Sequence, residues 1–270
     1  MKEQSVSAHP AFDEFVSTIA ALRAPDGCPW DREQTHESIA SNMLEEAYEA
    51  VDAIEQGDVA HLREELGDVL LQIVLQAQIA QDAGEFTIDD VIDDINAKMI
   101  RRHPHVFGEA QASSAQEVSA IWDAVKLTEQ EEGLLDSVPV GFPALMQASK
   151  ISRKVVSVGF EWETLNEVWE QVYSEIEELK HAYDQAPKDE KGRVLEKHEV
   201  ELEMGDVLFT LVNVSRKMGV DAETALRATC RKFKNRWAFI EGAAWAQGKR
   251  AENLSVEEME ELWAQAKTLE

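Results

Sequence analysis

Four sequence blocks occur twice in this 270-residue chain, in the same order. The N-terminal copy reads LEEAYE, EELGDVLLQIV, INAKMIRR and VSAIWDAVK, and the C-terminal copy reads YSEIEE, ELEMGDVLFTLV, TCRKFKNR and MEELWAQAK. A fixed order of similar blocks indicates an internal duplication, so we expect two copies of one structural module. The second copy is longer between its first two blocks by the polar stretch 184–193, which predicts a mobile loop there.

The spacing of apolar residues predicts an all-α fold, built from two tandem helical-bundle modules. Apolar positions recur at helical spacing in nearly every segment, and no alternating Val/Ile/Thr run predicts a sheet. Helix starts are predicted at Thr87, before Asp89 and Asp90, and at the capping-box pairs Ser114–Glu117 and Ser255–Glu258. The Gly- and Pro-containing segment 133–143 predicts a linker between an N-terminal module, 1–132, and a C-terminal module, 144–270.

The charge balance excludes several classes of partner. Lys and Arg number 26 against 53 Asp and Glu, giving a formal net charge of -27. The electrostatic field of this negative charge repels nucleic-acid phosphates and anionic lipids, so we expect neither nucleic acid nor membrane as a partner. It also repels a nucleoside triphosphate unless cations or a local cluster of basic residues compensate. Cys28 and Cys230 form no CxxC pair, which with the absence of a secretory signal indicates a cytoplasmic protein.

Paired acids recur in both copies at a spacing of three residues. The N-terminal acids are Glu46, Glu49, Glu65 and Asp68, and they match Glu175, Glu178, Glu203 and Asp206 in the C-terminal copy. Residues three apart share one face of a helix. The Gly57–Asp58 turn predicts that the two N-terminal helices pack antiparallel, which would gather all four acids.

A solvated helix face is the alternative explanation for these acids, because acidic helix residues are usually exposed. Against it, the residues after each aspartate, 69–75 and 207–212, are almost wholly apolar, which predicts a helix buried all round. Four carboxylates beside a core repel one another unless a cation is bound. Oxygen ligands favour Mg²⁺, with Mn²⁺ as a substitute, whereas the few Cys and scattered His residues disfavour zinc.

Basic clusters follow the acids in both copies. They contain Lys98, Arg101 and Arg102 in the first copy and Arg231, Lys232, Lys234 and Arg236 in the second. Each cluster has two possible interpretations. Its basic side chains either bind triphosphate oxygens or stabilise the negative end of a helix dipole. Trp122 and Trp263 are interpreted either as nucleobase platforms or as core residues. The two histidines around Pro104 are expected to be structural, with Pro104 ending the preceding helix.

The motifs CPWD (28–31), LEEAYE (44–49), EELGD (64–68) and RRHPHVF (101–107), followed by a degenerate second copy, closely resemble those of the two-domain MazG family. The resemblance covers nearly the whole chain. It implies an all-α fold, Mg²⁺-dependent hydrolysis of nucleoside triphosphates to monophosphate and pyrophosphate, and a homodimer whose subunits share each site.

The resemblance also assigns roles to residues of this chain. The implied metal ligands and catalytic acids of the C-terminal module are Glu175, Glu178, Glu203 and Asp206, the phosphate contacts are Lys232 and Arg236, and the base-facing residue is Trp263. The N-terminal counterparts are Glu46, Glu49, Glu65 and Asp68 with Lys98 and Arg102. Two-domain members usually place activity in the C-terminal module, which we follow here. Motif completeness favours the N-terminal module instead, because Ser174 replaces the glutamate present at Glu45 and Cys230 stands where the first copy has Asn96.

Two alternatives to a pyrophosphohydrolase of broad base specificity stay open. One is a narrower, dUTPase-like enzyme that removes modified nucleotides. The other is a non-catalytic acidic helical protein that binds nucleotides as a sensor. In the enzymatic interpretation water attacks a phosphorus atom of the triphosphate, and Glu45 or Glu177 takes the proton of that water.

Overall fold

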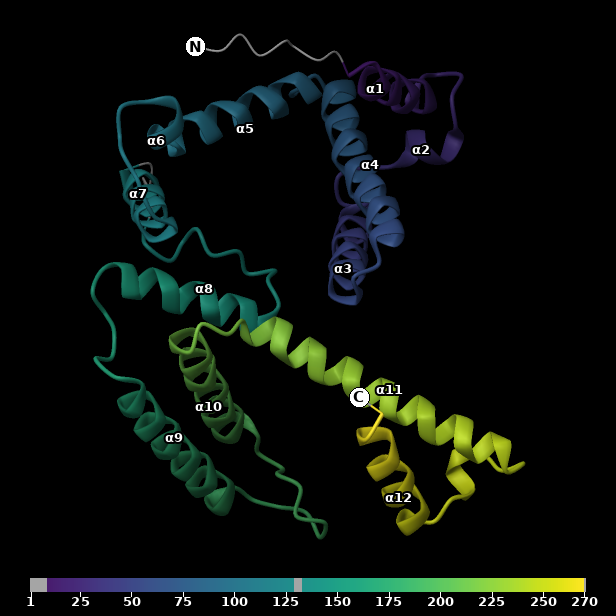
Figure 1. The fold of residues 1–270 in the computed structure, drawn as a ribbon, viewed down its shortest axis with the longest axis vertical. Helices are drawn as coiled ribbons and strands as arrows, with labels where there is room; N and C mark the ends of the chain where they lie inside the picture. The colour runs from purple at the N-terminus through teal and green to yellow at the C-terminus, as the bar shows by residue number, and fades with distance from the viewer. Residues whose placement is uncertain (1–8, 129–132, 270) are drawn as a thin grey trace. The chain divides into compact units, whose positions relative to one another are not determined.

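A computed structural model describes residues 9–128 and 133–269 of the chain. Within these two stretches no residue belongs to a β-strand, and one isolated bridge joins Lys188 to Val194. The all-α prediction is therefore confirmed. The chain divides into two compact units, Met1–Glu129 and Gln130–Glu270, each with its own helices (Figure 1).

The N-terminal unit is organised around a hairpin of two long helices, α3 and α4 (Figure 1). Helix α1 packs on α4, and α5 leads from the end of α4 to α6 and α7. The helices of this unit are α1 Pro10–Arg23, α2 Pro29–Glu33, α3 Ala40–Gln56, α4 Val59–Ala83, α5 Ile88–Arg102, α6 Pro104–Phe107 and α7 Ala115–Thr128.

The α3–α4 turn is short because each of its two residues suits its position. Gly57 ends α3 with a φ of 69°, a left-handed conformation that glycine adopts without steric cost. The Asp58 carboxylate accepts hydrogen bonds from the backbone amides of Ala60 and His61, at 3.1 and 3.0 Å, and so caps α4. The two helices therefore pack as antiparallel neighbours, as the sequence predicted.

Apolar side chains on α1, α4 and the residue before α3 form the core of the N-terminal unit. They are Ile19, Ile39, Val74, Leu75 and Ile79. An ion pair closes the end of this core, where Arg23 Nε donates to Asp82 Oδ2 at 2.7 Å. The Arg23 guanidinium also donates to the carbonyl of Gln34 at 3.2 Å, so this one side chain links α1, α4 and the chain after α2.

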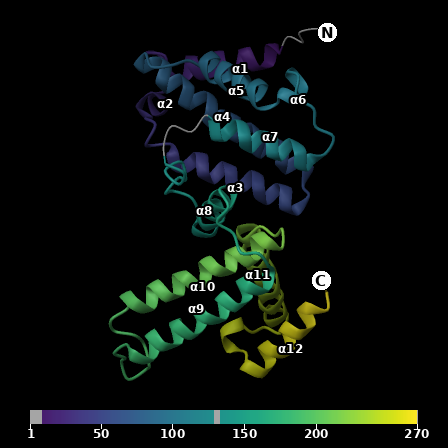
Figure 2. The ribbon, with the colours of Figure 1, turned by 90° about the vertical axis from the view of Figure 1, so that its left-hand side faces the viewer.

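The C-terminal unit contains a second hairpin, formed by α9 and α10, which lie side by side in Figures 1 and 2. Helix α8 packs on α10, and α12 packs on α11. The elements of this unit are α8 Ala144–Ser157, α9 Leu165–Gln185, α10 His198–Lys217, α11 Ala222–Ala246, the 3₁₀ turn Ala251–Asn253 and α12 Val256–Lys267. Its apolar clusters are centred on Val168, Val172 and Val214 and on Ile240, Ala244 and Leu254.

The connection between α9 and α10 differs from the mobile loop that the sequence predicted. Asp189 accepts hydrogen bonds from the backbone amides of Lys191 and Arg193, at 2.9 and 2.8 Å, which folds the stretch into a turn. The Tyr183 hydroxyl on α9 donates to the carbonyl of Gly192 at 3.0 Å and ties this turn to the helix. The prediction was wrong because composition reports polarity, whereas Asp and Gly at the right separation also build a closed turn.

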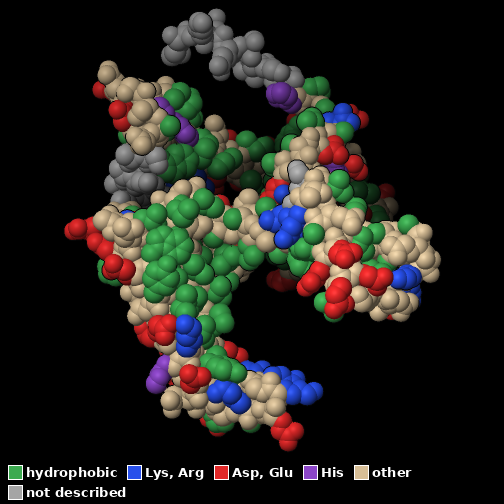
Figure 3. All heavy atoms as spheres, turned by 60° about the horizontal axis from the view of Figure 1, so that its bottom comes forward, with side chains coloured by type: hydrophobic (Ala, Val, Ile, Leu, Met, Phe, Trp, Pro, Cys, Tyr) green, Lys and Arg blue, Asp and Glu red, His purple; other side chains and the backbone are tan. Residues whose placement is uncertain are grey.

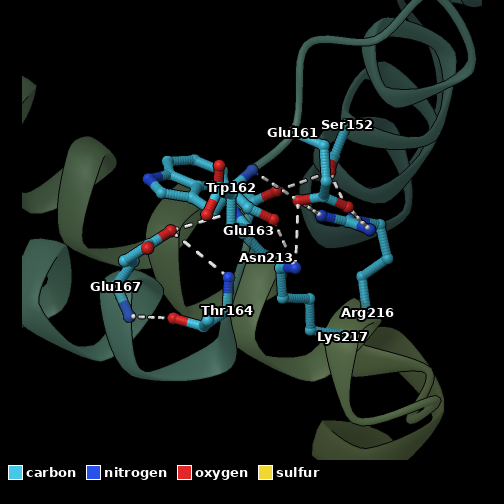
Figure 4. Close-up of polar contacts among 9 residues, drawn as sticks. All are labelled: Ser152, Glu161, Trp162, Glu163, Thr164, Glu167, Asn213, Arg216 and Lys217. Atoms are coloured by element: carbon cyan, nitrogen blue, oxygen red, sulfur yellow. Dashed lines mark hydrogen bonds and ion pairs between the residues drawn. The ribbon is translucent and has the colours of Figure 1, made fainter.

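A buried polar network holds α8 against α10 (Figure 4). Arg216 on α10 donates from Nε to the Ser152 hydroxyl at 2.7 Å, and Ser152 in turn donates to Asn213 Oδ1. The same guanidinium forms a bidentate ion pair with the Glu161 carboxylate, with nitrogen–oxygen distances of 2.7 and 2.8 Å. Lys217 donates to the carbonyl of Trp162 at 2.6 Å, so the chain entering α9 is also fixed.

The structural repeat begins earlier in each half than the four sequence blocks. Helices α1 and α8 precede the hairpins and pack on the equivalent helices α4 and α10. The predicted capping box at Ser255–Glu258 is present, the predicted helix start at Thr87 is a capping box with Asp90, and a further capping box lies at Thr164–Glu167. At the predicted pair Ser114–Glu117, the Ser114 hydroxyl accepts from the Glu117 amide at 3.2 Å, but the Glu117 carboxylate accepts from the amide of Ser113.

The second helix of each hairpin is not buried all round within one chain, which corrects the prediction from its apolar composition. Leu66 on α4 is 54% exposed and Leu208 on α10 is 47% exposed. Exposed apolar side chains form broad patches on the face shown in Figure 3. Helix α4 contacts α1, α3 and α5, and α10 contacts α8, α9 and α11, but these neighbours leave part of the apolar surface of both helices exposed. Among the described residues no helix is long and apolar enough to cross a bilayer.

Candidate functional site

The α3–α4 hairpin brings three of the four predicted N-terminal acids together. One carboxylate oxygen from each of Glu46, Glu49 and Glu65 lies within 4.8 Å of the other two. Asp68 lies outside this set, although its charge is close enough to raise the pKa of Glu46. The antiparallel turn and the three-residue spacing therefore assemble a compact cluster from two helices.

Glu65 is the buried member of this cluster, with 6% of its surface exposed. Its Oε1 accepts a hydrogen bond from His61 Nε2 at 2.7 Å, one helical turn earlier on α4. Its Oε2 is buried and has no hydrogen-bond donor among the described residues. A buried carboxylate oxygen without a donor is costly, and a cation bound beside Glu46 and Glu49 would satisfy it.

Crowding shifts the protonation of the N-terminal acids. Burial is the main cause that raises the pKa of Glu46, followed by the charges of Asp68 and Glu49. Burial also raises the pKa of Glu49, together with the charge of Glu65. Both effects penalise the ionised carboxylates, and a divalent cation would reverse them.

The α9–α10 hairpin also gathers three acids in the C-terminal unit, although one of the three differs from the N-terminal set. Oxygens of Glu175, Glu203 and Asp206 lie within 4.8 Å of one another. Glu178 lies outside this set, but its charge is the largest one acting on Glu203, whose pKa is raised first by burial and then by these neighbours. Glu175 accepts from Gln171 Nε2 at 2.7 Å.

Each predicted tryptophan lies against the predicted arginine of the same half. The Arg102 guanidinium carbon is 5.2 Å from the ring centre of Trp122, and that of Arg236 is 5.2 Å from the ring centre of Trp263. This is the range of a cation–π contact. The agreement between the halves shows that the duplication extends to side-chain geometry.

The remaining basic and histidine residues have distinct settings. Lys98 lies on α5 at the edge of a mainly apolar 1310 Å³ hollow that it shares with residues of α1 and α4. Lys232 is exposed on α11, one turn before Arg236.

His103 Nδ1 donates to the carbonyl of Met99 at 2.6 Å and its ring packs edge-on against Trp122. This supports the structural interpretation of His103, and α5 does end at Arg102, just before Pro104.

The carboxylates and the arginine–tryptophan pairs lie on different helix pairs of each unit. The acids belong to α3–α4 and α9–α10, whereas the aromatic pairs belong to α5–α7 and α11–α12. In Figure 1, α12 lies along α11 and away from the α9–α10 hairpin. The largest charges acting on Glu46 and Glu203 accordingly come from neighbouring carboxylates, not from the basic clusters.

A 770 Å³ hollow lies beside the C-terminal acids, between α9, α10 and their connecting turn. Glu178 and Glu203 line it together with His181 and His198. In the N-terminal hairpin, the two helices are joined by the two-residue turn Gly57–Asp58 instead. The longer connection of the second copy therefore opens a space next to its acids.

Sequence reasoning missed two side chains that contact the clusters, His61 and Gln171. Both lie four residues before a predicted acid, His61 before Glu65 and Gln171 before Glu175. That spacing places a side chain on the same helix face as the acid. A search for hydrogen-bond donors at this spacing would have found both residues.

The tandem helical units and their paired acid clusters define a class of all-helical proteins with two candidate metal sites. The model of the MazG nucleotide pyrophosphohydrolase domain matches the chain twice, at residues 34–107 and 163–238. The chain therefore belongs to the MazG nucleotide pyrophosphohydrolase family.

Three relatives illustrate the extent of the similarity. The chain is 41% identical to the nucleoside triphosphate pyrophosphohydrolase of Escherichia coli K12, over 96% of this chain and 97% of that protein. It is 42% identical to the nucleoside triphosphate pyrophosphohydrolase/pyrophosphatase MazG of Thermotoga maritima, over 99% of this chain and 98% of that protein. It is also 44% identical to the uncharacterized protein YabN of Bacillus subtilis, over all of this chain and 54% of that longer protein.

Proposed function

We propose that this protein hydrolyses nucleoside triphosphates to nucleoside monophosphate and pyrophosphate in a Mg²⁺-dependent reaction. The observation that carries the proposal is the cluster of three carboxylates, within 4.8 Å of one another, in each unit. Family membership and the two relatives named for this activity, similar over nearly their whole length, support the reaction class.

The residues present fit a hard divalent cation. All ligand atoms in both clusters are carboxylate oxygens, the type that Mg²⁺ and Mn²⁺ prefer. The buried Oε2 of Glu65 lacks a donor, as expected for an atom that binds a cation. When bound, Mg²⁺ would neutralise charge on the triphosphate and make an attacking water more acidic.

The remaining chemistry is assigned to side chains of this chain. Water forms a bond to the α-phosphorus, the bond to the bridging oxygen breaks, and pyrophosphate leaves with that oxygen. In the C-terminal unit, the acids Glu175, Glu178, Glu203 and Asp206 hold the cation, and Lys232 and Arg236 contact phosphate oxygens. In the N-terminal unit, Glu46, Glu49, Glu65 and Asp68 hold the cation, with Lys98 and Arg102 as phosphate contacts.

A general base is available in each half, but at different positions. Glu45 is exposed next to the N-terminal cluster, and its charge adds to the shifts of Glu46 and Glu49. Its counterpart Ser174 donates a hydrogen bond to Glu178 at 3.0 Å and is no base. Glu177, which lines the C-terminal hollow and pairs with Lys180 at 2.7 Å, takes that role in the second half.

Turnover is assigned mainly to the C-terminal unit, with broad base specificity. The 770 Å³ hollow beside Glu178 and Glu203 supports this location, because the N-terminal turn leaves no equivalent connection. Trp263 offers a flat ring beside Arg236, and we expect a base to stack there without selection, since every nucleobase has a flat face.

We infer that the chain forms a homodimer through the uncovered face of its hairpins. Leu66 and Leu70 on α4 and Leu208 and Leu211 on α10 are exposed in the single chain. Covering such residues releases apolar surface from water. Sedimentation is expected to show a dimer, and an active monomer would contradict this inference.

Pyrophosphate release from a panel of natural and modified triphosphates tests the function directly. We expect release from several bases in Mg²⁺, lower but measurable release in Mn²⁺, and none in excess chelator. Full activity in chelator would contradict the metal requirement. Release from one modified base alone would favour the narrower house-cleaning enzyme, and no release from any triphosphate would favour a nucleotide sensor.

A further inference from the structure

His61 gives the N-terminal acid cluster a contact that the C-terminal cluster lacks. The imidazole lies one turn before Glu65 on α4, and its Nε2 is 2.7 Å from Glu65 Oε1. At the equivalent position before Glu203, the C-terminal unit has Glu199, whose charge adds to the repulsion on Glu203. The counterpart acids Glu65 and Glu203 therefore differ in what lies one turn earlier on the helix, a hydrogen-bond donor before Glu65 and a further carboxylate before Glu203.

The contact constrains how Glu65 can present its two oxygens. Oε1 is engaged by the imidazole, while Oε2 is buried without a donor. Glu65 itself is 6% exposed, so the carboxylate has little room to turn toward solvent. Turning the carboxylate plane away from the imidazole would lose the hydrogen bond, whereas a half-turn about its last bond only exchanges two equivalent oxygens. The imidazole thus selects one orientation of the buried ligand.

His61 is close to the cluster without being part of its ligand set. The three oxygens within 4.8 Å of one another come from Glu46, Glu49 and Glu65, and the imidazole is not among the grouped atoms. Its Nε2 is 2.7 Å from Glu65 Oε1, so the imidazole is in direct contact with one of these acids. Donors placed in this way behind a ligating carboxylate hold it in its binding orientation.

We propose that His61 is a positioning residue of the N-terminal metal site, which holds Glu65 Oε1 so that Oε2 is directed at a divalent cation between Glu46, Glu49 and Glu65. The inference rests on the metal dependence proposed above and deepens it. It makes Glu65 dependent on a hydrogen-bond donor that its counterpart Glu203 does not have at the same position.

Mn²⁺ binding to the full chain at a fixed neutral pH tests the role. The C-terminal cluster is first disabled by Glu203→Gln and Asp206→Asn, so that the remaining high-affinity Mn²⁺ site is N-terminal. Adding His61→Ala is expected to weaken Mn²⁺ binding roughly 10- to 100-fold, as is typical when an outer donor is removed. His61→Gln keeps an N–H near the position of Nε2 and is expected to restore most of the affinity. The matched control His198→Ala removes a histidine that lines the C-terminal hollow and is expected to leave this affinity unchanged.

Spectroscopy separates positioning from direct ligation. Electron spin-echo measurements on bound Mn²⁺ are expected to show no nitrogen coupling from His61, because only oxygens bind the ion. Nitrogen coupling that disappears in His61→Ala, with no rescue by glutamine, would overturn the positioning role in favour of direct ligation. Equal Mn²⁺ affinity in His61→Ala and its parent, both folded at the temperature of measurement, would also overturn it.

The test distinguishes this role from the proposed enzyme activity. Pyrophosphate release by the unsubstituted chain is measured in parallel. Metal-dependent pyrophosphate release together with unchanged Mn²⁺ affinity in His61→Ala would refute the positioning role of His61 and leave the proposed activity standing. Absence of both Mn²⁺ binding and pyrophosphate release in the unsubstituted chain would refute the proposed function and this inference together.

Discussion

The N-terminal and C-terminal hairpins hold corresponding acids but differ in what surrounds them. The α3–α4 hairpin closes over Gly57 and Asp58, keeps Glu45 beside its cluster, and supplies His61 as a donor to its buried acid. The α9–α10 hairpin has a longer connection, a serine in place of Glu45, and a 770 Å³ hollow beside its acids. The comparison indicates that the duplication kept the four acids of each half, whereas the three acids that lie closest together and the residues around them differ between the halves.

The largest expected effect comes from removing one ligand charge in the C-terminal half, with the same change in the N-terminal half for comparison. Glu203→Gln or Asp206→Asn is expected to lower pyrophosphate release at saturating Mg²⁺ by at least about 100-fold, since charge neutralisation at the phosphates is lost. The matched changes Glu65→Gln and Asp68→Asn are expected to leave most of the activity. All four variants are compared after circular dichroism and sedimentation show that they are folded and assembled.

The opposite pattern would reverse the assignment of turnover. Loss of activity in the Glu65 and Asp68 variants alone would place turnover in the N-terminal unit. Loss in both pairs would mean that the halves act as one catalytic unit.

A smaller effect is expected at the aromatic pairs. Trp263→Ala removes a stacking surface worth about 1–3 kcal/mol per base, so KM for a triphosphate is expected to rise roughly 10-fold with a smaller change in kcat. Trp122→Ala is expected to change KM less, because turnover is assigned to the other half. Trp263→Phe keeps a flat ring and serves as the control. An unchanged KM in Trp263→Ala would show that Trp263 is a core residue.

The ion pairs at the ends of the two cores predict different responses to pH. Hydrogen bonds from Arg216, followed by its charge, hold the pKa of Glu161 below its usual value. A carboxyl group with a lowered folded-state pKa contributes stability above its unfolded pKa of about 4.3 and loses it as the pH falls through the folded value. Glu161→Gln is therefore expected to lower the free energy of unfolding by about 1–2 kcal/mol near pH 7. This difference is expected to shrink below about pH 4.

The ion pair between Arg23 and Asp82 in the N-terminal unit is the control for this experiment. Asp82 pairs with Arg23 at 2.7 Å but is more exposed than Glu161, at 39% against 26% for the side chains. Asp82→Asn is expected to have a smaller effect at pH 7 because exposed ion pairs are weak. A difference between wild type and Glu161→Gln that persists unchanged at pH 3 would contradict the ionic explanation.

The smallest expected effects concern helix caps. Thr164 caps α9 and Thr87 caps α5, each in a reciprocal capping box. Replacing either with alanine is expected to cost about 1 kcal/mol of stability. Thermal unfolding checks this, with serine at the same positions as the control. Only Thr164→Ala is expected to affect metal binding, because α9 carries Glu175 whereas α5 carries no cluster acid.

The sequence predicted most of the architecture because its signals are local. Helical periodicity, the turn at Gly57–Asp58 and the caps at Thr87 and Ser255 each depend on residues a few positions apart. The acid clusters followed from the same spacing. Each compact set holds three of the four predicted acids, with Asp68 and Glu178 outside the two sets.

Features that depend on three-dimensional neighbours were not predicted. Composition described the α9–α10 connection as mobile, although Asp189 and Tyr183 close it into a turn. The apolar runs predicted helices buried all round, but whether Leu66 and Leu208 are covered depends on partners outside the helix. The pairing of Arg236 with Trp263 joins residues on separate helices and has no local sequence pattern.

The packing of α8 on α10 determines where the C-terminal half can be cut. The family match starts at residue 163, after α8, yet Ser152 on that helix accepts from Arg216 and donates to the buried Asn213. A fragment starting at residue 163 would leave both partners without their buried contact and would lack Trp162, which packs against the apolar cluster around Val214. The segment that is recognisable by similarity is thus shorter than the segment that folds, and useful truncations begin before Ala144.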